Sequence, residues 1–153
     1  MTTLHDVNPA YGLFGIKALT DTCTLPTKAF RGDAGFDVYS DEPTFQLKFA
    51  QRKKVKLGFS MDLPFGWMAL IQEKSGMALA DGILTIGNVI DSGYRGEVHA
   101  ILLCLDSYPV LIKQSQKVAQ MIILPCYTGG EYTIKKELSL GSRGINGFGS
   151  TGL

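Results

Sequence analysis

The chain has almost no charge imbalance and no long apolar run, and each shortage excludes a class of protein. Its 153 residues carry a formal net charge of +1, so charge gives no reason to expect nucleic acid or an anionic membrane as a partner. The longest apolar stretch, residues 100–105, is far too short to cross a bilayer. Residues 51–56 are basic, but they lead into alternating apolar positions. They are therefore interpreted as the solvated end of a strand rather than a nucleic-acid patch.

Cysteine is also scarce. Cys23, Cys104 and Cys126 are odd in number and widely spaced, and they form no C-x-x-C pair and no plausible disulfide framework. This usage is typical of a reducing compartment. The first residues have neither a basic start nor an apolar run, so no secretory signal is expected. We expect a protein that is not secreted, in the cytoplasm or, if the source is viral or eukaryotic, in the nucleoplasm of a host cell.

Glycine, in contrast, is abundant near the end of the chain. Residues 147–152 have the spacing G-x-G-x-x-G. In a dinucleotide-binding fold a helix must follow this motif, and only one residue follows here, so we do not expect that fold. The segment also offers a guanidinium (Arg143), an aromatic ring (Phe148) and two hydroxyls (Ser150, Thr151). These groups are suited to closing over a phosphate chain and stacking on a flat base.

The rest of the sequence favours short strands separated by glycine, proline and aspartate. Apolar or alternating runs of strand length occupy residues 55–63, 67–71, 98–105 and 121–124. Only residues 76–81 have helical character. A hairpin is expected where 83–86 and 89–90 flank the pair Gly87-Asn88. The pattern predicts an all-β sandwich or barrel with one short helix over residues 1–140, followed by a flexible arm over 141–153.

Five short motifs occur in a fixed order along the chain. They are Ala34-Gly-x-Asp37, Lys74-Ser-Gly76, Ile90-Asp-x-Gly-Tyr-Arg-Gly-Glu97, Gln116-Lys-x-Ala-Gln120 and Arg143-Gly-x-x-Gly-Phe-Gly-Ser-Thr-Gly152. In this order they resemble the motifs of the trimeric deoxyuridine triphosphatase (dUTPase) family. The resemblance covers residues 33–152, and the third and fifth motifs are individually specific.

The resemblance implies a jelly-roll-like β domain in a homotrimer, with three active sites at subunit interfaces. The implied reaction is hydrolysis of dUTP to dUMP and pyrophosphate with Mg²⁺, without nucleic-acid or membrane partners. Asp91 matches the catalytic aspartate, which orients and deprotonates the water that attacks the α-phosphorus. Asp37 is the best partner for the waters of the metal.

Other matching residues would bind the nucleotide. By resemblance, backbone groups at the hairpin tip around Asn88 meet the uracil edge, Tyr94 packs against the deoxyribose, and Phe148 stacks on the base as the arm closes. The implied phosphate contacts come from Lys74, Ser75, Gly76, Gln120, Arg143, Gly149, Ser150 and Thr151.

Two departures from the family pattern bear on this site. Lys74 stands where arginine is usual, which keeps the charge but loses bidentate geometry. Asn88 stands where glycine is frequent, with Gly87 shifted by one position. Two alternatives stay open: a dCTP deaminase-like relative, whose deaminating glutamate is not located here, and a nucleotide-binding regulatory or structural trimer.

Overall fold

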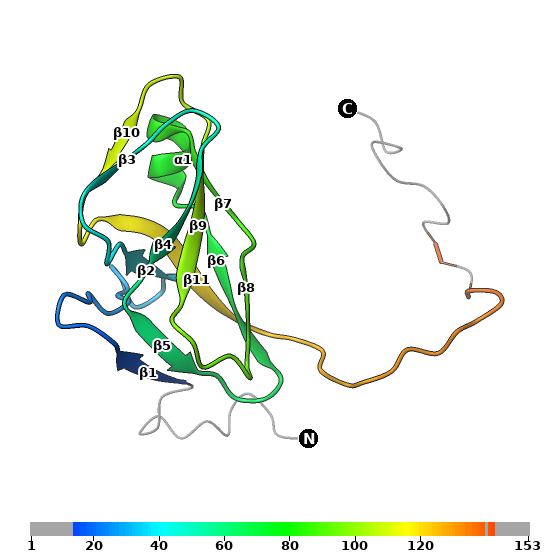
Figure 1. Cartoon of the computed structure of the whole chain (residues 1–153). Coiled ribbons are helices and arrows are strands. Elements are labelled where there is room, and N and C mark those ends of the chain that lie inside the picture. The colour runs from blue at the N-terminus through cyan, green and yellow to red at the C-terminus, as the bar shows by residue number, and fades with distance from the viewer. Residues whose placement is uncertain (1–13, 140, 143–153) are drawn as a thin grey trace.

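The structure is a computed structural model that describes residues 14–139 and 141–142. These residues form eleven strands and one helix (Figure 1). In chain order the elements are β1 (Gly15–Ala18), β2 (Gly35–Tyr39), β3 (Phe45–Leu47), β4 (Arg52–Lys56), β5 (Phe59–Asp62), β6 (Trp67–Gln72), α1 (Ser75–Asp81), β7 (Ile83–Ile86), β8 (Val89–Asp91), β9 (His99–Cys104), β10 (Val110–Ile112) and β11 (Lys117–Pro125). The expectation of an all-β fold with one short helix is confirmed.

Among the described residues, the strands pair in four antiparallel sheets. The largest has the order β2-β11-β6-β8, and a three-stranded sheet has the order β4-β9-β7. Two-stranded sheets are formed by β1 with β5 and by β10 with β3. Neighbours in these sheets are mostly distant in sequence, so the arrangement depends on long-range pairing rather than on local hairpins.

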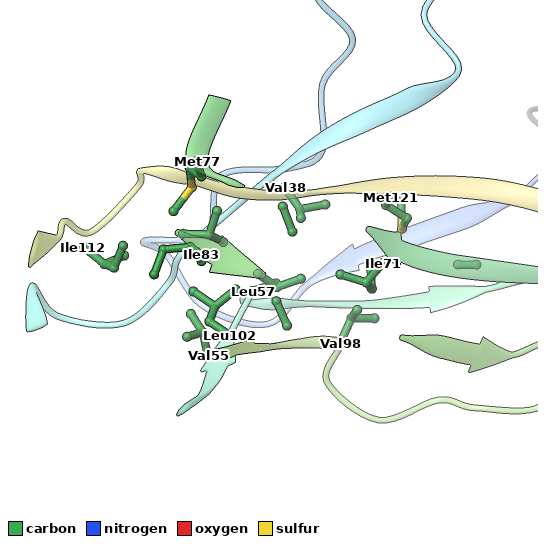
Figure 2. Packing of buried hydrophobic residues seen from close by; sticks show 14 of the residues in the cluster. Val38, Val55, Leu57, Ile71, Met77, Ile83, Val98, Leu102, Ile112 and Met121 are labelled. Carbon is green, nitrogen blue, oxygen red and sulfur yellow. The ribbon is translucent and has the colours of Figure 1, made fainter. Parts of the chain in front are cut away.

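Side chains from the two larger sheets meet in one apolar core (Figure 2). The cause is the period of two along each strand, which sends alternate residues to opposite faces. In β9, Ala100, Leu102 and Cys104 are buried, and in β6, Ala69 and Ile71 are buried. Full burial of a side chain as large as Leu102 or Ile71 contributes about 1.5–3 kcal/mol.

Helix α1 is only about two turns long because the sequence has a helix-terminating glycine soon after the helix begins. Lys74 precedes it in an extended conformation, and the following residues, including Ala78 and Leu79, are good helix formers. It ends at Gly82, whose φ of 56° is left-handed and whose N–H donates to the carbonyl of Met77. A Cβ atom at Gly82 would also lie 2.9 Å from the backbone nitrogen of Asp106. The position therefore requires glycine for two reasons, the positive φ and the lack of space for a Cβ.

The expected hairpin at Gly87-Asn88 is wrong in its pairing. Strands β7 and β8 exist at the expected positions, but β7 pairs with β9 and β8 pairs with β6. A two-residue hairpin turn of type I′ needs positive φ at both central residues, whereas only Gly87, at 64°, has it here. The N–H of Ile71 donates to the carbonyl of Asn88 at 2.9 Å, so the chain bends there and crosses from one sheet to the other.

After β11 the chain leaves the β domain (Figure 1). Residues 126–139 contain no strand, and this segment exposes the large apolar side chains of Tyr127, Tyr132, Ile134 and Leu138. Within the described part of the chain, the one helix is far from the length that a membrane span needs.

Candidate active site

The third motif surrounds a hollow of about 190 Å³, called the Asp91 hollow below. It is lined by Lys54, Gly87, Val89, Ile90, Asp91, Tyr94, Glu97, His99 and Ile101. Two of the predicted site residues, Asp91 and Tyr94, thus share one concave surface. Asp91 is the last residue of β8 and is exposed, and no ion pair formed among the described residues involves it. Its charge is therefore not engaged within that part of the chain.

The loop after Asp91 is held in shape by its own hydrogen bonds. The N–H of Tyr94 donates to the carbonyl of Asp91 at 3.1 Å. The Arg95 guanidinium donates to the carbonyls of Ser92 and Tyr94, at 2.5 and 3.0 Å, and pairs with the carboxylate of Asp62 on β5. These bonds fix the loop to the domain beside the carboxylate of Asp91.

The first, second and fourth motifs surround a different hollow, of about 310 Å³, called the Lys74 hollow below. It is lined by Ala29, Phe30, Asp33, Ala34, Gly35, Asp37, Lys74 and Gln120. The Gln120 side chain is oriented by a bond of 3.0 Å from its Nε2 to the carbonyl of Glu73. Gly35 makes room for it, because a Cβ there would lie 2.9 Å from Gln120 Oε1.

Asp37 lies between two cations beside this hollow. Nζ of Lys74 donates to Oδ1 and Nζ of Lys117 donates to Oδ2, each at 2.7 Å. Burial by itself would raise the pKa of Asp37, but the hydrogen bonds and charges of Lys117 and Lys74 hold it below its usual value. The same contact raises the pKa of Lys117. Asp37 is therefore ionised at neutral pH and keeps both lysines in place.

The two hollows share no lining residue. Asp91 pairs with Met68 in β6, and Lys74 follows six residues after Met68, beyond the far end of the same strand. This is about 20 Å of chain at about 3.3 Å per residue. The structure thus divides the predicted site residues into two groups at opposite ends of β6.

The remaining predicted residues have these positions. Asn88 lies in the bend beside the Asp91 hollow. Ser75 and Gly76 are the exposed first residues of α1. Arg143, Phe148, Gly149, Ser150 and Thr151 lie outside the described residues.

Sequence reasoning did not select Lys117 or Lys54. Lys117 lies inside the fourth motif, so its basic charge beside Gln120 was an available signal. Lys54 reaches the Asp91 hollow from β4, and only the pairing of β4 with β9 brings it there. No local pattern in the sequence indicates that placement.

The described residues contain no cluster of three or more His, Cys, Asp and Glu side chains suited to holding a metal. A carboxylate that is already neutralised by two lysines attracts a cation weakly. This donor set is therefore compatible with Mg²⁺ only if phosphate oxygens and water supply most of its ligands.

Comparison with known proteins places the chain in a family. The family model described as dUTPase matches residues 21–152. The deoxyuridine 5'-triphosphate nucleotidohydrolase of Clostridium novyi is 38% identical over 90% of this chain and 97% of its own length. The enzyme of the same name from Clostridium acetobutylicum is 39% identical over 90% and 95%.

Solved structures agree on the fold. The dUTPase of Staphylococcus bacteriophage 80alpha with dUPNHPP has a TM-score of 0.80 at 22% identity, covering 92% of this chain and 98% of that one. A mutant dUTPase from phage phi11 of S. aureus, described with a structural Mg(II) ion, has a TM-score of 0.76 at 18% identity, covering 84% and 100%. The extent of the family match and the identity to full-length relatives confirm the resemblance seen in the five motifs: this chain belongs to the dUTPase family.

Proposed function

We propose that this protein hydrolyses dUTP to dUMP and pyrophosphate, with Asp91 activating the attacking water. The observation that carries the proposal is the exposed Asp91 carboxylate in a hollow shared with Tyr94. A carboxylate at this position can accept the proton of a water in line with the α-phosphorus. The new bond joins the water oxygen to the α-phosphorus, and the bond to the bridging oxygen breaks, which releases pyrophosphate.

Base selection follows from the bend at Gly87-Asn88. Uracil donates at N3 and accepts at O4, and cytosine reverses this pattern. Backbone groups matched to uracil would be left unpaired against cytosine, at a cost of about 1–3 kcal/mol for each buried group. The bond from the Ile71 N–H to the Asn88 carbonyl fixes the bend that presents these groups. The Tyr94 ring faces the deoxyribose and leaves no space for a 2′-hydroxyl.

The Lys74 hollow binds the phosphates. Phosphoryl transfer depends mostly on positioning and on neutralising charge, which Lys74 and the oriented amide of Gln120 supply. Ser75 and Gly76 offer N–H groups at the exposed start of α1, where no side chain caps the helix. When bound, Mg²⁺ would neutralise phosphate charge, and Asp37 would hold it through water.

The separation of the two hollows supports a site shared between subunits. One nucleotide cannot join Asp91 and Lys74 of the same chain if about 20 Å of strand lies between them. Strands β7 and β9 also have apolar residues on the face turned away from the core, where Leu84, Ile86, Ile101 and Leu103 are only half-buried. Apolar faces of this kind mark subunit contacts. We infer a homotrimer in which Asp91 of one subunit works with Lys74 of the next.

The arm, residues 141–153, would complete the site by closing over the nucleotide. Thirteen residues span at most about 43 Å when extended, which is enough to reach a neighbouring subunit. In this proposal Arg143 meets phosphate and Phe148 stacks on the uracil. We expect the enzyme to act in a reducing compartment, because its three cysteines are free rather than joined in disulfides.

A nucleotide panel tests the proposed function. Pyrophosphate release is measured for dUTP, dCTP, dTTP and UTP, with and without Mg²⁺, for the wild type and for Asp91→Asn. The proposal expects release from dUTP with a kcat/KM well above that of the other three nucleotides, dependent on Mg²⁺ and abolished in the variant. Release of ammonia from dCTP would instead support a deaminase, and binding of dUTP without turnover would support a regulatory trimer.

A further inference from the structure

Tyr94 is held in place by residues that follow it in the loop. We propose that Gly96 and Glu97 determine the sugar specificity of the enzyme by fixing the Tyr94 ring at the Asp91 hollow. The inference rests on the proposed function, in which this ring faces the deoxyribose.

Gly96 permits the ring to lie against the backbone. A Cβ atom at Gly96 would lie 2.5 Å from Tyr94 Oη and 2.6 Å from Cζ, closer than real Cβ contacts allow. Gly96 is not among the glycines with positive φ, so its backbone suits alanine equally well. The ring is 42% exposed and can move outwards. Any side chain at Gly96 therefore acts on the ring of Tyr94 rather than on the fold.

The carbonyl of Glu97 fixes the other end of the tyrosine. Tyr94 Oη donates to this carbonyl at 2.8 Å, and His99 Nδ1 lies 2.8 Å from the same oxygen. The Glu97 carboxylate is tied down as well, by the N–H of Gly58, which donates to its Oε1 at 3.3 Å. Because His99 belongs to β9 and Gly58 precedes β5, these contacts connect the tyrosine hydroxyl to the rigid sheets.

Together the two constraints define one position for the ring. A ring that only leaned on the loop would yield to a 2′-hydroxyl. A ring that lies against the Gly96 backbone and is bonded to the Glu97 carbonyl moves only when that bond breaks, because supporting contacts with the sheets set its geometry. Gly96 and Glu97 are thus positioning residues, and Tyr94 is the group that meets the sugar.

The test compares two alanine substitutions in one loop. Gly96→Ala displaces the ring, whereas Gly93→Ala adds a Cβ that meets nothing within 4 Å. The measured quantity is the ratio of kcat/KM for dUTP to kcat/KM for UTP. We expect this ratio to fall by about tenfold in Gly96→Ala, in the range that one misplaced group in a pocket produces, and to stay at the wild-type value in Gly93→Ala.

The same change in a Tyr94→Ala background isolates the mechanism. Once the ring is absent, Gly96→Ala is expected to have no further effect on the ratio. A wild-type ratio in Gly96→Ala, or an equal fall with and without the ring, would overturn the inference. If Gly96→Ala does not fold, Tyr94→Phe removes only the hydroxyl bond to Glu97, and an unchanged ratio in that variant also overturns it. A wild type that hydrolyses neither nucleotide would refute the proposed function instead.

Discussion

Replacing Asp37 with asparagine removes the one negative charge that holds two lysines beside the Lys74 hollow. The side chain of Asp37 is 12% exposed and accepts a bond from Lys74 at 2.7 Å. A buried bond between charged groups contributes about 1.5–3 kcal/mol, and the partial exposure of Lys74 reduces this to about 1 kcal/mol. The more exposed Lys117 adds a smaller amount. We expect Asp37→Asn to lower the free energy of unfolding by about 1–2 kcal/mol at neutral pH.

The effect has a defined pH dependence. The pKa of Asp37 is lower in the folded chain than in the unfolded chain, so its stabilisation is fully present above the unfolded value and is lost as the pH falls through the folded value. The wild type and the variant should therefore differ by a constant amount between about pH 5 and 8, and the difference should begin to shrink below about pH 4.

Urea unfolding at a fixed subunit concentration measures the difference, followed by the fluorescence of the single tryptophan, Trp67. The matched control is Asp62→Asn, which removes an ion pair with Arg95 whose carboxylate is 69% exposed. That change should cost less than about 0.5 kcal/mol. Equal losses in the two variants, or a loss in Asp37→Asn that does not shrink as the pH is lowered below about 4, would refute the reasoning.

Three further changes have defined outcomes. Asp91→Asn should abolish pyrophosphate release while dUTP affinity, measured by calorimetry, stays within about tenfold, because the amide keeps the shape but accepts no proton. Truncation after Ser142 should also abolish turnover. If the arm closes over the site of a neighbouring subunit, mixing truncated subunits with full-length Asp91→Asn subunits should restore activity. Verified mixed trimers without activity would contradict this. Gly82→Ala should lower the melting temperature, with a loss of about 1–2 kcal/mol, because φ is positive and backbone blocks the Cβ.

Local patterns in the sequence predicted most of the secondary structure. The apolar run of strand length in residues 98–105 predicted a strand, and His99–Cys104 forms β9 with every second side chain in the core. The helical character of residues 76–81 predicted α1, which begins one residue earlier. These predictions hold because both signals depend only on side-chain period and on local propensity.

Local patterns in the sequence could not predict which distant strands pair with each other. Nothing in Ile83–Ile86 or Val89–Asp91 indicates that each prefers another partner, since that choice depends on which strand edges β9 and β6 offer. The contact between Asp37 and Lys117 has the same origin. It exists because β11 pairs with β2 in a register that sets Lys117 opposite Tyr39 and Gln120 opposite Asp37.

The sequence also did not predict which site residues lie together within one chain. Five ordered motifs predicted which residues act together, and the family comparison confirmed the family to which they belong. Which of them meet within one chain depends on the length of β6 between Met68 and Lys74. The motif resemblance implied sites at subunit interfaces, and this geometry supports that proposal by showing which of the residues lie together within one chain.

Complementation between two impaired variants tests the shared site most directly. Asp91→Asn lacks the water-activating carboxylate, and Lys74→Ala lacks the phosphate-binding cation, so each trimer alone should be nearly inactive. If Asp91 and Lys74 of different subunits form each site, random reassembly of equal amounts pairs an intact Asp91 with an intact Lys74 in about a quarter of the sites, and dUTP hydrolysis should return to about a quarter of the wild-type rate. Mixed trimers, verified by mass, whose activity does not exceed the sum of the two parents would contradict the account.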